Sequence, residues 1–393
     1  MHTVSPHLTA RARWAVVAMF FLNGFVVGSW APQIPALVDR LDIDKLTLGL
    51  LILGFGLGAL TLMPVAGILL ARRQSRTVVV GFATIVVFSL LAVAASPHLA
   101  VTAAVMFVFG GVVGGMDVAM NANAVTVERR LGRPIMSSSH GFWSLGGFAG
   151  GGLGGLAVEQ VGALAHGAMV AAVTLPILVA GAPHLIGGDR PAPAGAPRRL
   201  SLPRDPMIYL VGVIALLCMI PEGAVLDWAA LYLQNERGAG IATSGFAFAV
   251  FSAAMALMRF VGDAVRHRWG AVATMRVSSL VAAAGMLAAG LSPWPWLAIG
   301  AFGLAGLGIA NMVPIAFSAA GNHPGLSSGT GMSIVTTMGY SGILVAPSAI
   351  GFVAQMIGLA PVFVALSALI VVVFLGAGLV RHADFATGQP PAA

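Results

Sequence analysis

The sequence predicts an all-α, polytopic membrane protein in which twelve transmembrane helices form two six-helix bundles with pseudo-two-fold symmetry. Three observations support this prediction: the composition, a series of long apolar segments, and a proline-rich break in the middle of the chain. Hydrophobic residues make up 58% of the 393 residues and charged residues only 8%, against roughly 25% charged in soluble domains. A water-soluble globular fold is therefore excluded.

Twelve apolar segments are about 20 residues long or longer, enough to cross a hydrocarbon core of ~30 Å at ~1.5 Å per residue. In the first half of the chain they run over 14–38, 47–70, 77–95, 99–126, 136–157 and 167–187. In the second half they run over 207–233, 242–262, 271–291, 297–320, 329–352 and 361–380. The first segment is too long for the core of a signal peptide, so we treat it as a transmembrane helix.

The basic residues predict how these helices are oriented. Of the 20 Lys and Arg residues, 17 fall on one side of a twelve-helix arrangement, and only Arg40, Lys45 and Arg237 fall on the other. Loops rich in Lys and Arg stay in the cytoplasm, so we expect both termini there and the protein in the inner (plasma) membrane of the cell. Topology thereby explains the net charge of +7, and we expect no nucleic-acid partner.

The segment 188–206 is not suited to cross a membrane, because prolines alternate there with small and basic residues. This composition predicts a solvated cytoplasmic linker. The linker would separate an N-terminal six-helix bundle, 1–187, from a C-terminal six-helix bundle, 207–393.

The two halves show a weak internal similarity, which is typical of transporters built from repeats. The segment Asn23–Ala31 resembles Glu222–Ala229 with one residue deleted. The segment 140–142 likewise resembles 338–340. The matches occur in equivalent order in both halves, which favours a duplicated architecture.

A short motif after the eighth apolar segment makes the chain resemble the major facilitator superfamily over its whole length. Gly262 and Asp263 are followed by Arg266 and Arg268, which looks like the cytoplasmic loop signature of that superfamily. The resemblance implies a cytoplasmic gate loop at these four residues. The equivalent loop in the first half has Ala71 where the acidic residue of the signature stands.

The fourth and fifth apolar segments are similar, more narrowly, to those of fucose-permease-like proton symporters, through Gly115–Ala122 and Ser139–Gly146. In that family an acidic residue stands where Asp117 does, four residues before an Asn. The other intramembrane acid of the family has no counterpart here, since Gly28–Ala31 occupies its region. The resemblance implies proton-coupled transport of a sugar or a similar solute.

Three acidic residues are candidates for proton coupling. Asp117 lies well inside an apolar segment, where a lone carboxylate costs at least ~2.5 to 3.5 kcal/mol, so we expect it to be protonated much of the time. The alternative is a structural Asp that is hydrogen-bonded to Asn121, one helical turn away. Glu222 and Asp227 follow Pro221, which loosens their helix. Their alternatives are a structural acid paired across the two halves for Glu222, and an interfacial residue in contact with water for Asp227.

Polar and aromatic residues inside the apolar segments predict a substrate site. His140 and Trp143 lie on one helix face, where an imidazole can relay a proton or bind a hydroxyl group and an indole offers a stacking surface. The alternative places both at the cytoplasmic membrane boundary. The further candidates are Asn23, Trp30, Asn121, Asn311 and Tyr340. No second His, Cys or carboxylate stands at helical spacing from His140, so we expect no metal and no cofactor.

Glycines at a spacing of four follow His140 in the fifth apolar segment. They are Gly146, Gly147, Gly150, Gly151, Gly154 and Gly155. This pattern predicts close packing of helices in the bilayer. A phosphate-binding loop is excluded, because no strand precedes the glycines and no Lys follows them.

These features together predict a secondary transporter and not an enzyme. We expect a proton-coupled symporter of a small polar organic solute such as a sugar, which works by alternating access as a monomer in the lipid bilayer. Proton-antiport export of drugs or metabolites is the main alternative, since the sequence does not display direction. The sequence lacks the phosphate loop of an ATP-driven pump and the His-Glu-x-x-His and Gly-x-Ser-x-Gly motifs of candidate intramembrane enzymes. A channel is disfavoured as well, because alternating access needs two bundles whereas a pore needs rings of like residues or a filter.

Overall fold

The computed structural model describes residues 6–131, 135–187, 203–324, 326 and 328–383, and among these it contains helices and no strand. The helices of the first half are α1 (Pro6–Trp30), α2 (Gln33–Leu41), α3 (Lys45–Arg72), α4 (Ser75–Ala95), α5 (Leu99–Leu131), α6 (Met136–Gly181) and η1 (Ala182–His184). Those of the second half are α7 (Pro206–Arg237), α8 (Ile241–Trp269), α9 (Ala271–Leu291), α10 (Pro295–Ile309), α11 (Met312–Gly321), α12 (Ser328–Ile357), α13 (Leu359–Gly376) and η2 (Ala377–Ala383).

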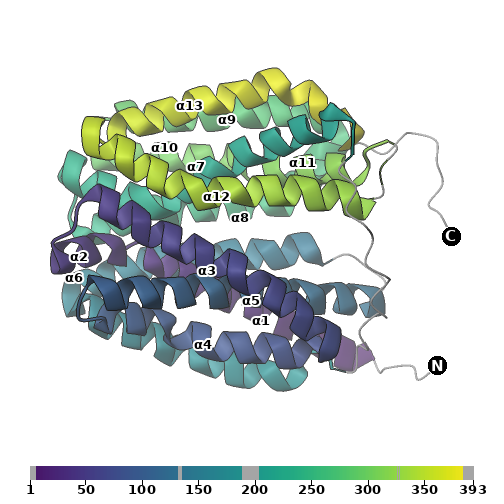
Figure 1. Cartoon of the computed structure of the whole chain (residues 1–393), viewed down its shortest axis with the longest axis horizontal. Coiled ribbons are helices and arrows are strands. Elements are labelled where there is room, and N and C mark those ends of the chain that lie inside the picture. The colour runs from purple at the N-terminus through teal and green to yellow at the C-terminus, as the bar shows by residue number, and fades with distance from the viewer. Residues whose placement is uncertain (1–5, 132–134, 188–202, 325, 327, 384–393) are drawn as a thin grey trace.

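The helices are grouped into two bundles, one from each half of the chain (Figure 1). In the first, α1 packs on α6 and α5 packs on both α3 and α4. In the second, α7 packs on α12, and α9 packs on α10 and α13. The bundles meet along two seams, where α6 contacts α8 and α3 contacts α12. The predicted linker, 188–206, lies mostly outside the described residues, so its boundaries stay a prediction.

Eleven helical segments in the described part of the chain are long and apolar enough to cross a membrane. One of them, α6, has 46 residues, which at ~1.5 Å per residue would extend over ~69 Å, about twice the thickness of a hydrocarbon core. Gly162 interrupts it with φ 81° and ψ 166°, a conformation that glycine adopts readily because it has no Cβ. With α6 divided at this kink into two crossings, the structure agrees with the twelve predicted.

The first predicted helix, 14–38, is wrong at its C-terminal end. The chain turns after Trp30, and the separate helix α2 begins at Gln33. Pro32 and Pro35 explain the break, because neither has the N–H group that would continue the hydrogen bonding of α1. Asp44 then caps α3.

The cap at Asp44 is a local reason for the start of α3. Its carboxylate accepts a hydrogen bond from the backbone N–H of Thr47 at 2.8 Å. Hydrogen bonds from the side chain and the backbone of Thr47 hold the pKa of Asp44 below its ordinary value. A carboxylate at this position satisfies one of the free N–H groups at the helix N-terminus.

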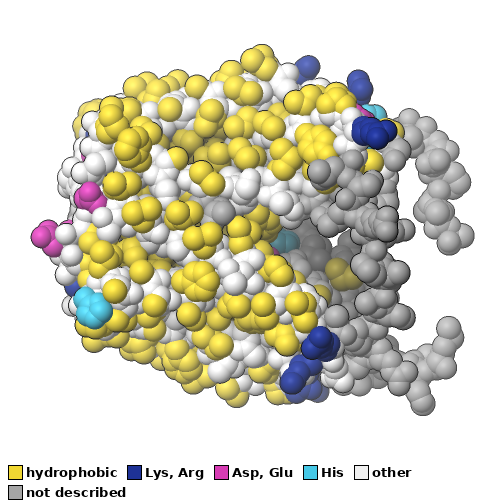
Figure 2. All heavy atoms as spheres, viewed as in Figure 1, with side chains coloured by type: hydrophobic (Ala, Val, Ile, Leu, Met, Phe, Trp, Pro, Cys, Tyr) yellow, Lys and Arg dark blue, Asp and Glu magenta, His cyan; other side chains and the backbone are white. Residues whose placement is uncertain are grey.

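Both chain ends lie at one edge of the molecule, which we call the termini face, and the opposite edge is the far face (Figure 1). Toward the termini face α3 and α12 diverge (Figure 1), and the space-filling view shows a hollow between the bundles on that side (Figure 2). Figure 2 also shows hydrophobic side chains over the sides of both bundles, with Lys and Arg gathered near the termini face. Among the described residues, the two bundles therefore separate toward the termini face along α3 and α12 (Figure 1).

The glycines of α6 form two packing stripes, as predicted from their spacing. In one stripe, methyl groups added at Gly146 or Gly150 would overlap with the backbone of α1. In the other, the space next to Gly155 is filled by the backbone of Ala242 and Gly245 on α8. One stripe thus holds the first bundle together, and the other lets the two bundles touch.

We predict that Gly150→Ala lowers the stability of the protein while Gly152→Ala, on the same helix, does not. A methyl group at Gly150 would meet the backbone of Phe25 and Ser29, whereas the nearest atom at Gly152 is 3.6 Å away, an ordinary contact. Overpacking of this kind costs about 1–3 kcal/mol. Thermal unfolding in detergent measures the difference, and equal melting temperatures for the two variants would contradict the packing described.

Candidate functional site

A cluster of polar side chains lies where the two bundles meet, part of the way along their helices. It is drawn from α5, α6, α7, α8 and α12, and we call it the central cluster. Its members are Asp117, Asn121, His140, Ser144, Glu222, Arg259 and Tyr340. All except Ser144 keep part of their surface exposed, so the cluster lines space that a solute or water can reach.

Within the first bundle, three members form a hydrogen-bonded chain. The Asn121 amide donates to the Asp117 carboxylate at 3.2 Å and to the Asp117 backbone carbonyl at 2.8 Å. Its amide oxygen lies 3.3 Å from Nε2 of His140. An amide oxygen only accepts, so in this arrangement Nε2 carries the hydrogen. The contact of Asp117 with Asn121 belongs to the alternative that the sequence left open for Asp117, and the structure adds His140.

Arg259 joins the two bundles at the central cluster. From α8 its guanidinium lies 3.6 Å from the carboxylate of Glu222 on α7, and it donates a hydrogen bond of 2.5 Å to the hydroxyl of Ser144 on α6. The acid predicted to pair across the halves therefore pairs within its own half. Arg259 makes the connection to the first bundle.

Electrostatic interactions tie the remaining members together. The charges of Asp117 and Glu222 both act on the hydroxyl of Tyr340, and the charge of Arg259 acts on His140. Two carboxylates thus share the cluster with one guanidinium. Within the described part of the chain, Asp117 has no ion-pair partner, so the cluster has an excess of one negative charge when both acids are ionised. A proton or a cation at Asp117 would neutralise it.

Asp227 and Trp30 meet nearer the far face. The indole N–H of Trp30 on α1 donates to the Asp227 carboxylate on α7 at 3.3 Å, and both residues are buried. The alternative in which Asp227 is an interfacial residue in contact with water is therefore wrong in this conformation. The contact crosses from one bundle to the other.

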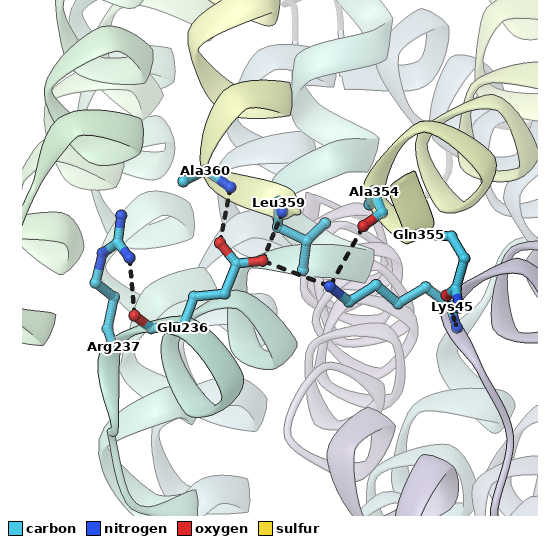
Figure 3. A network of polar contacts seen from close by, with 7 residues as sticks. All are labelled: Lys45, Glu236, Arg237, Ala354, Gln355, Leu359 and Ala360. Carbon is cyan, nitrogen blue, oxygen red and sulfur yellow. Dashed lines mark hydrogen bonds and ion pairs between the residues drawn. The ribbon is translucent and has the colours of Figure 1, made fainter. Parts of the chain in front are cut away.

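At the far face itself, a network that we call the far-face clasp joins the bundles (Figure 3). Nζ of Lys45, at the start of α3, lies 3.5 Å from the carboxylate of Glu236 on α7 and donates to the carbonyl of Ala354 on α12 at 3.4 Å. Glu236 accepts hydrogen bonds from the backbone N–H groups of Leu359 and Ala360 at 2.6 and 3.0 Å. These groups begin α13, where a carboxylate is favoured by the helix dipole.

Three residues predicted to bind substrate, Asn23, Trp143 and Asn311, instead make contacts within their own bundles. Asn23 is buried; its amide oxygen accepts from the Trp143 indole at 2.9 Å, and its amide nitrogen lies 3.5 Å from the Val113 carbonyl. Asn311 is also buried and packs against Gly262 of α8. The structure thus brings neither Asn23 nor Asn311 into the central cluster, and it orients the Trp143 indole N–H toward Asn23.

The predicted gate loop is helical. Gly262, Arg266 and Arg268 all lie in the last turns of α8, which continues to Trp269. Arg266 donates to the Ser318 hydroxyl at 2.9 Å and to the carbonyl of Ala383, so it fastens elements of the second bundle to each other. The side chain of Asp263 lies outside the described residues.

Sequence reasoning missed Arg259 because, although it lies inside the predicted eighth segment, 242–262, it was counted with the basic residues on the cytoplasmic side. That helix extends seven residues beyond its predicted end at 262. The part of α8 that is apolar enough to cross a membrane ends at Gly262, so Arg259 lies three residues inside it. A charge inside an apolar segment is a signal of a functional site.

The comparisons with known proteins agree with this architecture. The chain is 35% identical over 368 residues to an uncharacterized MFS-type transporter of Yersinia pestis, covering 92% of this chain and 94% of that protein. It is 32% identical over 353 residues to the membrane protein MosC of Rhizobium meliloti, covering 88% and 84%.

Solved structures show the same fold at low sequence identity. The nucleoside transporter NupG has a TM-score of 0.74 at 14% identity, over 94% of this chain and 98% of that one. A D-xylose-proton symporter has a TM-score of 0.72 at 12% identity, over 94% and 97%. Residues 16–347 match the Major Facilitator Superfamily. The chain belongs to this superfamily of membrane transporters, which are not enzymes.

Proposed function

We propose that the protein is a proton-coupled symporter of a small polar organic solute such as a sugar, and that Asp117 carries the proton. The observation that supports this most is the charge imbalance of the central cluster. Glu222 faces the guanidinium of Arg259, whereas the carboxylate of Asp117 has an amide as its partner. A carboxylate without a cation inside a membrane favours proton uptake. Asp227, which is buried against Trp30, is the second candidate.

The chemistry of the cluster suits a solute that carries hydroxyl groups. Asn121, His140, Ser144 and Tyr340 offer donors and acceptors, and those of Asn121, His140 and Tyr340 belong to partly exposed side chains. Two proteins of the same fold are titled a nucleoside transporter and a D-xylose-proton symporter. That likeness shows the fold, and it supports a polar cargo here only by analogy.

Coupling follows from linkage between the proton and the solute. An unpaired charge at Asp117 opposes any closed state that removes it from water, and protonation eliminates that cost. A solute that hydrogen-bonds to both bundles stabilises the closed state further. Proton and solute therefore favour the same step, in which the central cluster closes toward the termini face and the far face opens.

We further propose that the termini face is the cytoplasmic side of the inner membrane and that the protein works as a monomer. The gathering of Lys and Arg near the termini face supports the orientation (Figure 2). In that orientation the structure is open to the cytoplasm, and the far-face clasp keeps the opposite side closed.

The excess negative charge of the cluster also suits a cationic solute that exchanges with protons. This second candidate, proton-antiport export, differs from symport in the sign of the response to pH. A pH gradient that is acidic at the far face would drive a symported solute toward the termini face and an antiported solute away from it. A thermal-shift screen of sugars, sugar acids, nucleosides and cationic drugs identifies the solute for such a test.

We predict that Asp117→Asn abolishes accumulation driven by a pH gradient in proteoliposomes but leaves exchange of solute at equal concentrations at least partly active. The amide keeps the size and most hydrogen bonds of the side chain and removes its proton. Asp39→Asn, an exposed residue on α2, is the matched control and should accumulate solute as the unmodified protein does. Normal accumulation by Asp117→Asn would exclude the proton role of this residue.

We predict that Lys45→Gln increases the population that is open at the far face. The variant removes the ion pair with Glu236 and the charge beside the end of α12. Both side chains are about one-fifth exposed, and such pairs contribute about 0.2–1 kcal/mol, so the population should change by a factor of about 1.4 to 5.

Spin labels measure this change as a distance across the far face. The labels replace Pro97 and Pro293, which are exposed in far-face loops of opposite bundles, in a Cys218→Ala background because Cys218 is the only cysteine. The fraction of molecules with the longer distance should increase in Lys45→Gln and not in Lys45→Arg. Identical distance distributions in all three proteins would show that the clasp does not hold the far face closed.

A further inference from the structure

A groove of about 590 Å³ opens on the outside of the first bundle at the termini face. It lies between the beginning of α1 and the segment formed by the end of α6 and η1. Arg11, Trp14 and His184 are its large polar or amphipathic lining residues. The remainder of the lining is small and apolar, and includes Ala18, Ile177 and Gly181. The groove is separate from the central cluster and has no part in the proposed transport step.

The polar end of the groove lies at the level of a membrane surface. The apolar part of α1 begins at Ala10, and that of α6 and η1 ends at His184, so Arg11 and His184 mark the ends of adjoining membrane-crossing segments. Both are exposed. The ring of Trp14 is 58% exposed, and Trp is favoured at the level of lipid headgroups.

The charge at this end is positive. Arg13, two residues from Arg11, places its guanidinium 5.7 Å from the centre of the Trp14 ring. Arg11 and His184 thus line the groove together with Trp14, and the guanidinium of Arg13 lies next to the same indole. Among the lining residues none is acidic. Arg and His side chains arranged in this way are donors for a phosphate diester.

The other end of the groove is lined by small and apolar residues. Small side chains on both walls create the depression, and Ala18 and Ile177 continue it from the basic end toward the interior of the bilayer. Burial of methylene groups along such a surface is favourable by about 0.8 kcal/mol each when they leave water. In a bilayer, however, the methylene groups of a lipid come from other lipid and not from water. The apolar end therefore contributes a fit of shape and little binding free energy.

We infer that the groove binds an anionic phospholipid, with the phosphate at Arg11 and His184 and one acyl chain along Ala18 and Ile177. The basic side chains at the headgroup level favour an anionic lipid over a zwitterionic one, because their charge is opposite to that of the anionic headgroup. Basic pockets between helices on the cytoplasmic side of membrane proteins bind anionic headgroups, because each basic side chain adds to the electrostatic attraction.

Quenching of Trp14 fluorescence by brominated lipid tests the inference. The purified full-length protein is titrated in detergent with brominated phosphatidylglycerol or brominated phosphatidylcholine. Because the chain has 7 tryptophans, the groove signal is the part of the quenching that disappears in Trp14→Phe. Half-maximal quenching should need about fivefold less phosphatidylglycerol than phosphatidylcholine, as one well-placed basic residue implies.

Variants separate a built site from general surface charge. Arg11→Gln should remove the preference for phosphatidylglycerol, and Arg276→Gln, at an exposed Arg of α9 in the other bundle, should keep it. Ala180→Leu changes an exposed residue of the groove wall, so it fills the groove without disturbing the core and should weaken quenching by both lipids. Equal quenching by the two lipids, or equal loss of preference in Arg11→Gln and Arg276→Gln, would overturn the inference. So would displacement of phosphatidylglycerol by millimolar inorganic phosphate, because the acyl chain would then contribute nothing.

Discussion

The guanidinium of Arg259 is the contact on which the arrangement of the central cluster depends. It reaches Glu222 in its own bundle and Ser144 in the other. A charge inside a membrane needs a partner of opposite sign, and among the described members of the cluster Arg259 is the one permanent cation. Its pairing with Glu222 therefore determines which acid is left without a cation. That acid is Asp117, and the proposed coupling of proton and solute follows from this unequal distribution of charge.

Contacts between the bundles differ along the membrane normal, and this difference gives the protein a direction of opening. The far face is held by the clasp around Lys45 and by the buried contact of Trp30 with Asp227. The glycine stripe of α6 allows the backbone of α8 to approach closely. The termini face, by contrast, opens to a hollow (Figure 2). Alternating access requires two interfaces of this kind, each closed in turn.

The sequence was sufficient for the fold, because hydropathy reports directly on length and number of crossings. It also singled out Asp117, Asn121 and His140 as candidates, and the structure brings these three together. Helix ends were the weak point. Hydropathy falls where basic residues begin, yet α8 continues past them. Arg259, inside the predicted segment 242–262, was therefore counted only as one of the basic residues on the cytoplasmic side. Contacts between distant segments could not be predicted either. Nothing local in the sequence indicates that Asn23 accepts a hydrogen bond from Trp143, or that Lys45 forms an ion pair with Glu236.

The central claim is that Asp117, and not Glu222, binds the proton. Infrared difference spectra between low and high pH detect the carbonyl stretch of a protonated carboxyl group, and they need no knowledge of the solute. The account predicts that this pH-dependent band is lost in Asp117→Asn and kept in Glu222→Gln, whose acid is paired with Arg259 in the structure. A band that persists in Asp117→Asn and disappears in Glu222→Gln would contradict it.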